Sequence, residues 1–209
     1  MPFVVGLTGG AASGKSTAGA LFEALGATLL DADAVSHALT GRGGKAVAAI
    51  ERAFGQDFIQ NGALNRPRMR ELVFRDATAR MQLEALLHPL IARGLQEAVL
   101  ASKGPYVVLE AALLVEKGSW RTLTNRLLVV DVPENVQIER MMQHRNLTEK
   151  TARAIIACQC SRQKRLALAD DVLINTGTLT DLKNAVSALH AKYLTLARNV
   201  RSREIEGAA

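Results

Sequence analysis

Aromatic side chains are scarce in this chain of 209 residues, since phenylalanine, tryptophan and tyrosine together make up 4% of it. Proteins that hold single-stranded nucleic acid stack its bases on aromatic rings, so we expect no nucleic-acid partner. Cysteine is scarcer still. Cys158 and Cys160 cannot form a disulfide framework and have no Cys or His at metal-binding spacing. We therefore expect two reduced thiols that pack in the protein interior.

Long apolar runs are also missing. No stretch approaches the ~18 apolar residues of a membrane span. The first residues lack the basic region of a signal peptide and lead directly into a glycine-rich segment. We therefore expect a cytoplasmic protein that makes no membrane contact.

Positive charge is in excess, and it is concentrated in two stretches. The chain holds 26 Lys and Arg against 20 Asp and Glu, a net charge of +6. Residues 64–104 carry seven basic and four acidic side chains, and residues 136–165 carry seven and two. Such stretches favour binding of polyanions, either nucleic acid or the phosphates of nucleotides, but a solvated helix face gives the same pattern.

Apolar strands alternate with helical patterns along the chain, which is typical of an α/β fold with a parallel sheet covered on both faces. More than 70 residues separate the second and third strands, too many for one crossover, so we expect a helical insertion there. Residues 55–65 are expected to form a loop, Pro89 to interrupt its helix, and the polar tail after Asn199 to fray. The expected strands are 3–8, 27–31, 106–110, 126–131 and 171–175, and the expected helices are 16–25, 46–54, 66–76, 78–102, 133–144, 148–165 and 179–198.

A glycine-rich segment follows the first strand and matches the phosphate-binding pattern G-x-x-x-x-G-K-[ST] over residues 9–16. Glycines let the backbone wrap around an anion with its N–H groups, and the dipole of the following helix favours phosphate. Lys15 can reach the β- and γ-phosphates, and the Ser16 hydroxyl can ligate Mg²⁺. The sequence therefore predicts a site for a nucleotide and Mg²⁺, formed by Gly10, Ala11, Ala12, Ser13, Gly14, Lys15, Ser16 and Thr17.

The identity of the nucleotide follows from motifs that are missing. GTP-dependent switches carry an Asp-x-x-Gly segment and an Asn-Lys-x-Asp segment that binds guanine, and neither occurs in this chain. ATP is therefore the expected nucleotide, and a small kinase is the expected class. The alternatives are a kinase of nucleoside monophosphates or of another small metabolite and, less favoured, a non-enzymatic nucleotide-dependent switch.

Five further segments occur in a specific order. They are Leu7-Thr8-Gly9-Gly10, Asp31-Ala32-Asp33, Leu87-His88-Pro89-Leu90-Ile91, Leu113-Leu114-Val115-Glu116, and Ala169-Asp170-Asp171-Val172 with Asn175. Together with the phosphate-binding pattern they resemble the dephospho-CoA kinase family over residues 3–198. The resemblance implies a P-loop kinase of three α/β/α layers with a five-stranded parallel sheet. Its parts would be a core (1–60, 104–135 and 166–209), an inserted helical substrate-binding domain (61–103) and a helical lid (136–165).

The same resemblance implies a reaction and the residues that serve it. The γ-phosphoryl group of ATP would pass to the ribose 3′-hydroxyl of dephospho-CoA, the last step of coenzyme A synthesis, in a monomer or weak homo-oligomer. Asp33 would accept the proton of that hydroxyl, although on sequence alone it could instead cap the following helix. Arg140 would contact the transferred phosphoryl group from the lid. Thr8, His88, Leu114 and Glu116 would line the acceptor site, and Asn175 would meet the adenine of ATP.

Three assignments have more than one candidate. The family's second lid arginine falls at His144, with Arg145 next to it, and both are candidates for its role. Glu110 is an alternative to Glu116 as the carboxylate that holds Mg²⁺ through water. Any of the arginines among residues 66–80 could meet the pyrophosphate of the acceptor.

Overall fold

The computed structural model describes residues 1–111 and 122–206, so Leu114 and Glu116 lie outside the described residues. By their internal contacts the residues fall into two compact units, which we call the sheet unit (1–30 and 99–209) and the helical unit (31–98). The elements follow in the order β1 (Val4–Gly9), α1 (Lys15–Ala24), β2 (Thr28–Asp31), α2 (Ala32–Thr40), α3 (Val47–Phe54), η1 (Gln56–Phe58), β3 (Ile59–Gln60), β4 (Ala63–Leu64), α4 (Arg66–Arg75), α5 (Ala77–Leu100), β5 (Val107–Glu110), β6 (Arg126–Asp131), α7 (Glu134–Arg145), α8 (Glu149–Ala157), α9 (Arg162–Ala167), β7 (Asp171–Ile174) and α10 (Leu179–Glu206).

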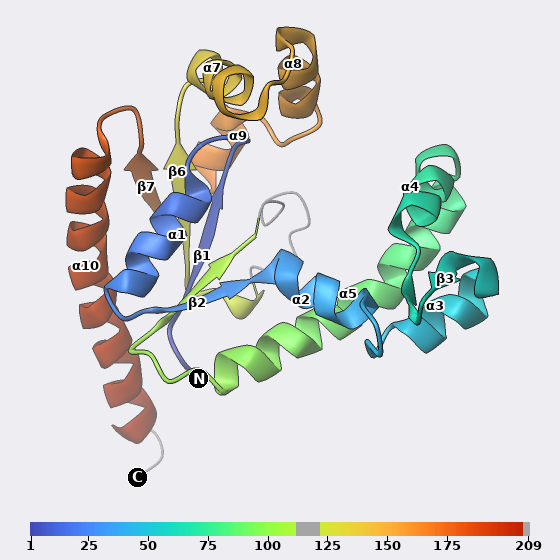
Figure 1. Ribbon diagram of the computed structural model, residues 1–209. Coiled ribbons are helices and arrows are strands. Elements are labelled where there is room, and N and C mark those ends of the chain that lie inside the picture. The colour runs from blue at the N-terminus through green and yellow to red at the C-terminus, as the bar shows by residue number, and fades with distance from the viewer. Residues whose placement is uncertain (112–121, 207–209) are drawn as a thin grey trace. The chain divides into compact units, whose positions relative to one another are not determined.

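The sheet unit is built on one five-stranded sheet with the order β2-β5-β1-β6-β7 (Figure 1). β1 runs parallel to β5 and β6, and β6 runs parallel to β7. Every residue of β1 and β5 is buried, as expected for central strands covered on both faces. The predicted α/β fold with a five-stranded parallel sheet is therefore confirmed. Because parallel strands end at one edge of a sheet, the segment after β1 opens where β5, β6 and β7 also end.

One apolar core fills the space between the sheet and helices α1 and α10, which pack against each other (Figure 1). Phe22 of α1 and Tyr193 of α10 are fully buried, with ring centroids 6.0 Å apart. Aromatic pairs at this separation are worth about 1 kcal/mol beyond the area they bury. The core thereby fixes the position of α1, whose first residue is Lys15 of the phosphate-binding segment.

The helical unit includes residues 31–60, which the sequence analysis assigned to the core. Their packing explains the difference. Val35 of α2 lies against Gly94 of α5, so closely that a Cβ on the glycine would come within 3.1 Å of the valine side chain. Arg66 of α4 donates a hydrogen bond of 2.6 Å to the hydroxyl of Thr40 at the end of α2. These contacts join α2 to the helices that follow it in sequence.

Several element predictions were wrong for local reasons. Helix α2 was expected only in the alternative in which Asp33 caps it. Its N-cap is instead Asp31, which accepts the N–H of Asp33 at 2.8 Å, so that alternative is excluded. The expected loop at 55–65 contains the β3–β4 hairpin, whose turn residues Asn61 and Gly62 both have positive φ, a pairing typical of tight hairpins.

Two long helices also differ from expectation. The 24-residue helix α5 continues through Pro89, because a proline removes only one of the many main-chain hydrogen bonds of such a helix. Helix α10 continues past Asn199 to Glu206, since Val200 packs against the core and Arg201 donates to the carbonyl of Pro105 at 3.2 Å. Among the helices of the described residues, none combines the length and apolarity needed to cross a membrane.

Asp171 begins β7 at the sheet edge opposite the phosphate-binding segment, and its carboxylate is almost fully buried. It accepts hydrogen bonds from Arg126 at 2.8 Å, Lys192 at 2.5 Å and Tyr193 at 3.0 Å. Burial alone would raise the pKa of Asp171, but these three donors outweigh it and hold the pKa below its ordinary value. The ionised carboxylate therefore joins β6, β7 and α10.

We predict that Asp171→Asn lowers the free energy of unfolding by about 2 kcal/mol at pH 7, because two cations lose their counter-ion. The native pKa is depressed, so this stabilisation is fully present above the unfolded pKa of about 4 and is lost as the pH falls through the native value. Urea unfolding of both proteins between pH 7 and pH 3 checks this. A difference in stability that grows below pH 4 would contradict it.

Candidate active site

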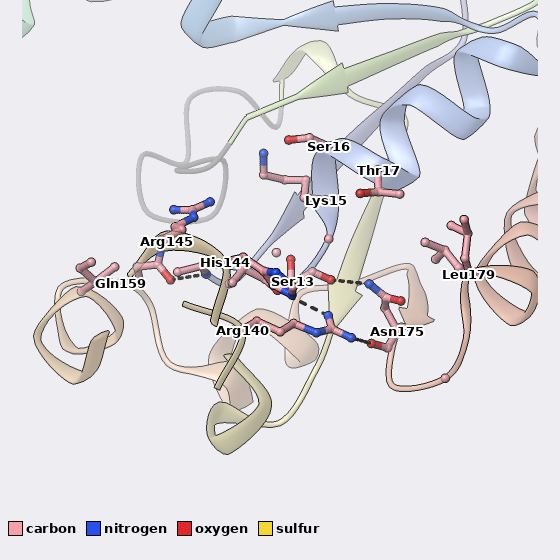
Figure 2. A pocket seen from close by; sticks show the side chains of 18 residues that line it. Ser13, Lys15, Ser16, Thr17, Arg140, His144, Arg145, Gln159, Asn175 and Leu179 are labelled. Carbon is pink, nitrogen blue, oxygen red and sulfur yellow. Dashed lines mark hydrogen bonds between the residues drawn. The ribbon is translucent and has the colours of Figure 1, made fainter. Parts of the chain in front are cut away.

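The phosphate-binding segment, residues 9–16, connects β1 to α1 and lines a cavity of about 630 Å³ (Figure 2). All the residues predicted to bind the nucleotide line this cavity, including Thr17, Arg140 and Asn175. The remaining wall comes from the end of β1, from α7, α8 and α10, and from the segments that follow α8 and precede α10. These residues are Gly9, His144, Arg145, Ile155, Gln159, Gly177, Leu179 and Leu182.

The backbone of this segment takes a shape that its small residues permit. Ala12 and Gly14 have φ values of 54° and 88°, and alternation of left- and right-handed residues creates a concave surface of N–H groups that suits an anion. A Cβ on Gly14 would lie 2.2 Å from the amide nitrogen of Asn175, and one on Gly10 would lie 2.5 Å from Oε1 of Gln137. Helix α1 has no side-chain cap, which leaves its first N–H groups available to phosphate.

Side chains from outside the segment hold its main-chain groups. Asn175, directly after β7, donates from Nδ2 to the carbonyl of Ser13 at 2.7 Å. Arg140 of α7 donates to the carbonyl of Asn175 at 2.8 Å and makes a weaker 3.5 Å contact with the carbonyl of Ala12. Carbonyl oxygens that are engaged in this way are drawn away from a bound anion, which leaves N–H groups to meet it.

These contacts add to the roles expected for two residues. The Asn175 side chain was expected to meet adenine, and in this structure its amide also holds the phosphate-binding segment. Its contact with adenine stays a prediction. Arg140 lines the cavity as expected, and in this structure its guanidinium also braces that segment. Its contact with a transferred phosphoryl group stays a prediction.

Gln159 contributes a further contact that the sequence analysis missed. Its Oε1 accepts the N–H of Ala11 at 3.0 Å. The residue lies between α8, which ends at Ala157, and α9, which is capped by the Ser161 hydroxyl. One helix had been expected over residues 148–165, and the interruption places Gln159 against the phosphate-binding segment. A Ser three residues before Lys164 was the available signal for a new helix start.

Glu110 ends β5, the neighbour of β1, and is nearly buried. Its Oε1 accepts from the ammonium of Lys15 at 2.5 Å and from the hydroxyl of Ser16 at 2.7 Å. The described residues hold no cluster of three or more His, Cys, Asp and Glu side chains. Mg²⁺ at nucleotide sites, however, uses one or two protein oxygens together with phosphate, and the oxygens of Glu110 and Ser16 fit that donor set.

The residues expected at the acceptor site and in the lid are distributed over both units. Thr8 is buried in β1 of the sheet unit. Asp33, exposed in the first turn of α2, and His88, half-buried in α5, both belong to the helical unit. His144 and Arg145 both line the cavity. Among the basic residues of α4, Arg66 binds Thr40, Arg68 pairs with Asp57 at 2.8 Å, and Arg70 is exposed.

The cysteines differ from expectation as well. Cys158 is exposed rather than packed in the interior, because it follows the last residue of α8, where the chain leaves the helix. Cys160 is half-buried in the same connection.

Comparison with known proteins extends this description. The family model of dephospho-CoA kinase matches residues 3–181. The dephospho-CoA kinase of Nitrosospira multiformis is 47% identical over 196 residues, covering 93% of this chain and 98% of that protein. The one from Burkholderia lata is 46% identical over 201 residues, covering 95% and 100%.

Solved structures with a similar fold were also found. The crystal structure of TT1252 from Thermus thermophilus has a TM-score of 0.78 at 33% identity and covers 91% of this chain and 97% of that one. The dephospho-CoA kinase from Campylobacter jejuni shows the same fold at 22% identity, with a TM-score of 0.72 and coverage of 92% and 97%. From the extent of the family match and the identity to these relatives, the chain belongs to the dephospho-CoA kinase family.

Proposed function

We propose that this kinase of dephospho-CoA binds ATP in the cavity of residues 9–17 and transfers the phosphoryl group from there. The observation that carries the proposal is the phosphate-binding segment itself, whose carbonyls are held by Asn175 and Arg140 while the N–H groups at the start of α1 have no side-chain cap. Phosphate that binds here replaces water at N–H donors whose orientation is already fixed. These donors stabilise the negative charge that develops during phosphoryl transfer.

Basic side chains complete the electrostatics of the proposed site. Lys15, Arg140, His144 and Arg145 line the same cavity. Phosphoryl transfer spreads negative charge over the equatorial oxygens, and cations held near those oxygens stabilise the transition state. We assign Lys15 to the β- and γ-phosphates and Arg140 to the transferred group. Residues 136–165 would act as the lid that carries Arg140.

Asp33 is proposed as the general base. A ribose hydroxyl that attacks phosphorus must lose its proton, and a carboxylate within hydrogen-bond reach accepts it. The side chain of Asp31 already caps α2, so the exposed carboxylate of Asp33 is not needed by the helix. We propose that the helical unit, which also holds His88, supplies the acceptor site.

Mg²⁺ is proposed to bind through the Ser16 hydroxyl directly and through Glu110 by way of water. When bound, Mg²⁺ would neutralise phosphate charge. Glu110 also orients the ammonium of Lys15, since both Lys15 and Ser16 donate to one of its oxygens.

The test of function offers dephospho-CoA, AMP and CMP separately with Mg-ATP and measures ADP release. We expect turnover with dephospho-CoA alone, with phosphate added at the 3′ position by mass spectrometry and NMR. Equal or faster turnover of AMP or CMP would instead favour a nucleoside monophosphate kinase.

For Asp33→Asn we expect kcat to fall by about 10²- to 10⁴-fold, because an amide cannot accept the proton. The KM for ATP should change little. Asp31→Asn is the matched control, since asparagine caps a helix as well as aspartate does and its kcat should stay near that of the unmodified protein. A loss confined to the Asp31 variant, or a large rise in KM for ATP in the Asp33 variant, would contradict the assignment.

For Glu110→Gln we expect the Mg²⁺ concentration that gives half-maximal activity to rise by about 10- to 100-fold, the usual effect of removing a group that orients a metal ligand. A titration of Mg²⁺ at fixed ATP measures it. Glu149→Gln, on the exposed first turn of α8, is the control and should leave the titration unchanged. An unaltered Mg²⁺ dependence in Glu110→Gln would refute the metal role.

A further inference from the structure

The side-chain amide of Gln159 has a fixed orientation. A main-chain N–H is a donor, so the amide that meets Ala11 must present its oxygen, as the 3.0 Å bond from Ala11 N to Oε1 shows. Its NH₂ group then points away from that bond. Across residues 1–111 and 122–206 no hydrogen-bond acceptor is found for this NH₂, although Gln159 lines the cavity.

Gln159 lies toward one side of the cavity and Leu179 toward the other (Figure 2). Arg145 lies on the Gln159 side, while Thr17 and Asn175 lie nearer to Leu179 (Figure 2). A nucleotide places its apolar base and its charged terminal phosphate at opposite ends. Apolar Leu179 and Leu182 suit the base, whereas basic Arg145 suits the phosphate end.

The position of Ala11 within its segment supports this direction. In phosphate-binding loops of this pattern the last residues, with the start of the helix, surround the α- and β-phosphates, and the lysine reaches toward the γ-phosphate. Ala11 is the third residue of the pattern and precedes those donors. A side chain that is hydrogen-bonded to the Ala11 N–H therefore lies near the γ-phosphate, on the side of the β-phosphate that faces away from the nucleoside.

We propose that Gln159 is a specificity-determining residue that donates from Nε2 to an oxygen of the γ-phosphoryl group and so favours ATP over ADP. The proposal rests on the proposed function, because it requires ATP in this cavity. The Ala11 N–H holds the amide in place before the nucleotide arrives, so little side-chain freedom is lost on binding. A neutral donor to a charged oxygen makes a charge-assisted hydrogen bond, which ADP lacks the oxygen to form.

Two substitutions separate this role from bracing of the loop. Gln159→Glu keeps an oxygen for the Ala11 N–H but replaces the NH₂ donor with a negative charge. Gln159→Met has similar size and offers neither group. Gln163→Glu and Gln163→Met are matched controls, since Gln163 is exposed on α9 and does not line the cavity.

The measurement is isothermal titration with ADP and with a β,γ-imido analogue of ATP, each with Mg²⁺. We expect both Gln159 variants to bind the ATP analogue about 10- to 100-fold more weakly, with ADP affinity within about threefold of the unmodified protein. Both Gln159 variants therefore lose most of the preference for the triphosphate over ADP, and their kcat is lowered as well. The Gln163 variants keep the full preference.

Two results would overturn the proposal. If Gln159→Glu keeps the triphosphate preference while Gln159→Met loses affinity for both nucleotides, Gln159 only braces Ala11. If both variants keep the preference, Gln159 has no role in recognition. Failure of the proposed function would look different, since the unmodified protein would bind neither nucleotide, or Lys15→Ala would bind both normally.

Discussion

The hydrogen bond from Asn175 to the carbonyl of Ser13 is the contact on which the rest of the site depends. A segment rich in glycine and alanine has many conformations when unconstrained, and fixing each residue costs about 1–2 kcal/mol of conformational entropy. Here that cost is met before any ligand binds, because Asn175 follows β7 directly and its main-chain N–H is bonded to Asp131 of β6 at 3.0 Å. The sheet thereby dictates where the phosphate-binding segment lies.

The basic side chains of residues 136–165 have several structural roles. The charge of this stretch alone therefore could not distinguish a polyanion-binding surface from a solvated helix face. Arg140 braces the phosphate-binding segment, and Arg162 makes two hydrogen bonds, of 2.8 and 2.7 Å, to the carboxylate of Asp131. Arg165 is buried. Apolar residues of the same stretch, Ile138, Met141 and Ala152, form a small cluster against Ala11 and Ala12. Part of the excess charge is therefore structural, Arg145 lines the cavity, and Lys150 and Lys164 are exposed outside it.

The features that sequence predicted well are those that local chemistry decides. The glycines and the lysine of residues 9–16 and the buried strand β1 carry their own patterns, so the sheet and the position of the glycine-rich segment after its first strand were predictable. The roles of Glu110, Asn175 and Gln159 depend on contacts with residues 94 or more positions away in the chain. A Gln between two cysteines carries no signal by itself, and only the break between α8 and α9 brings it to Ala11.

The most direct test of this account is the ADP affinity of Asn175→Ala, measured together with amide hydrogen exchange of residues 9–14 in the absence of nucleotide. We expect faster exchange in that segment and ADP affinity reduced by about tenfold or more, because the released segment must be ordered on binding. Asn199→Ala, exposed on α10, should change neither quantity. Unaltered exchange and affinity in Asn175→Ala would show that the segment holds its shape by itself and would contradict the account.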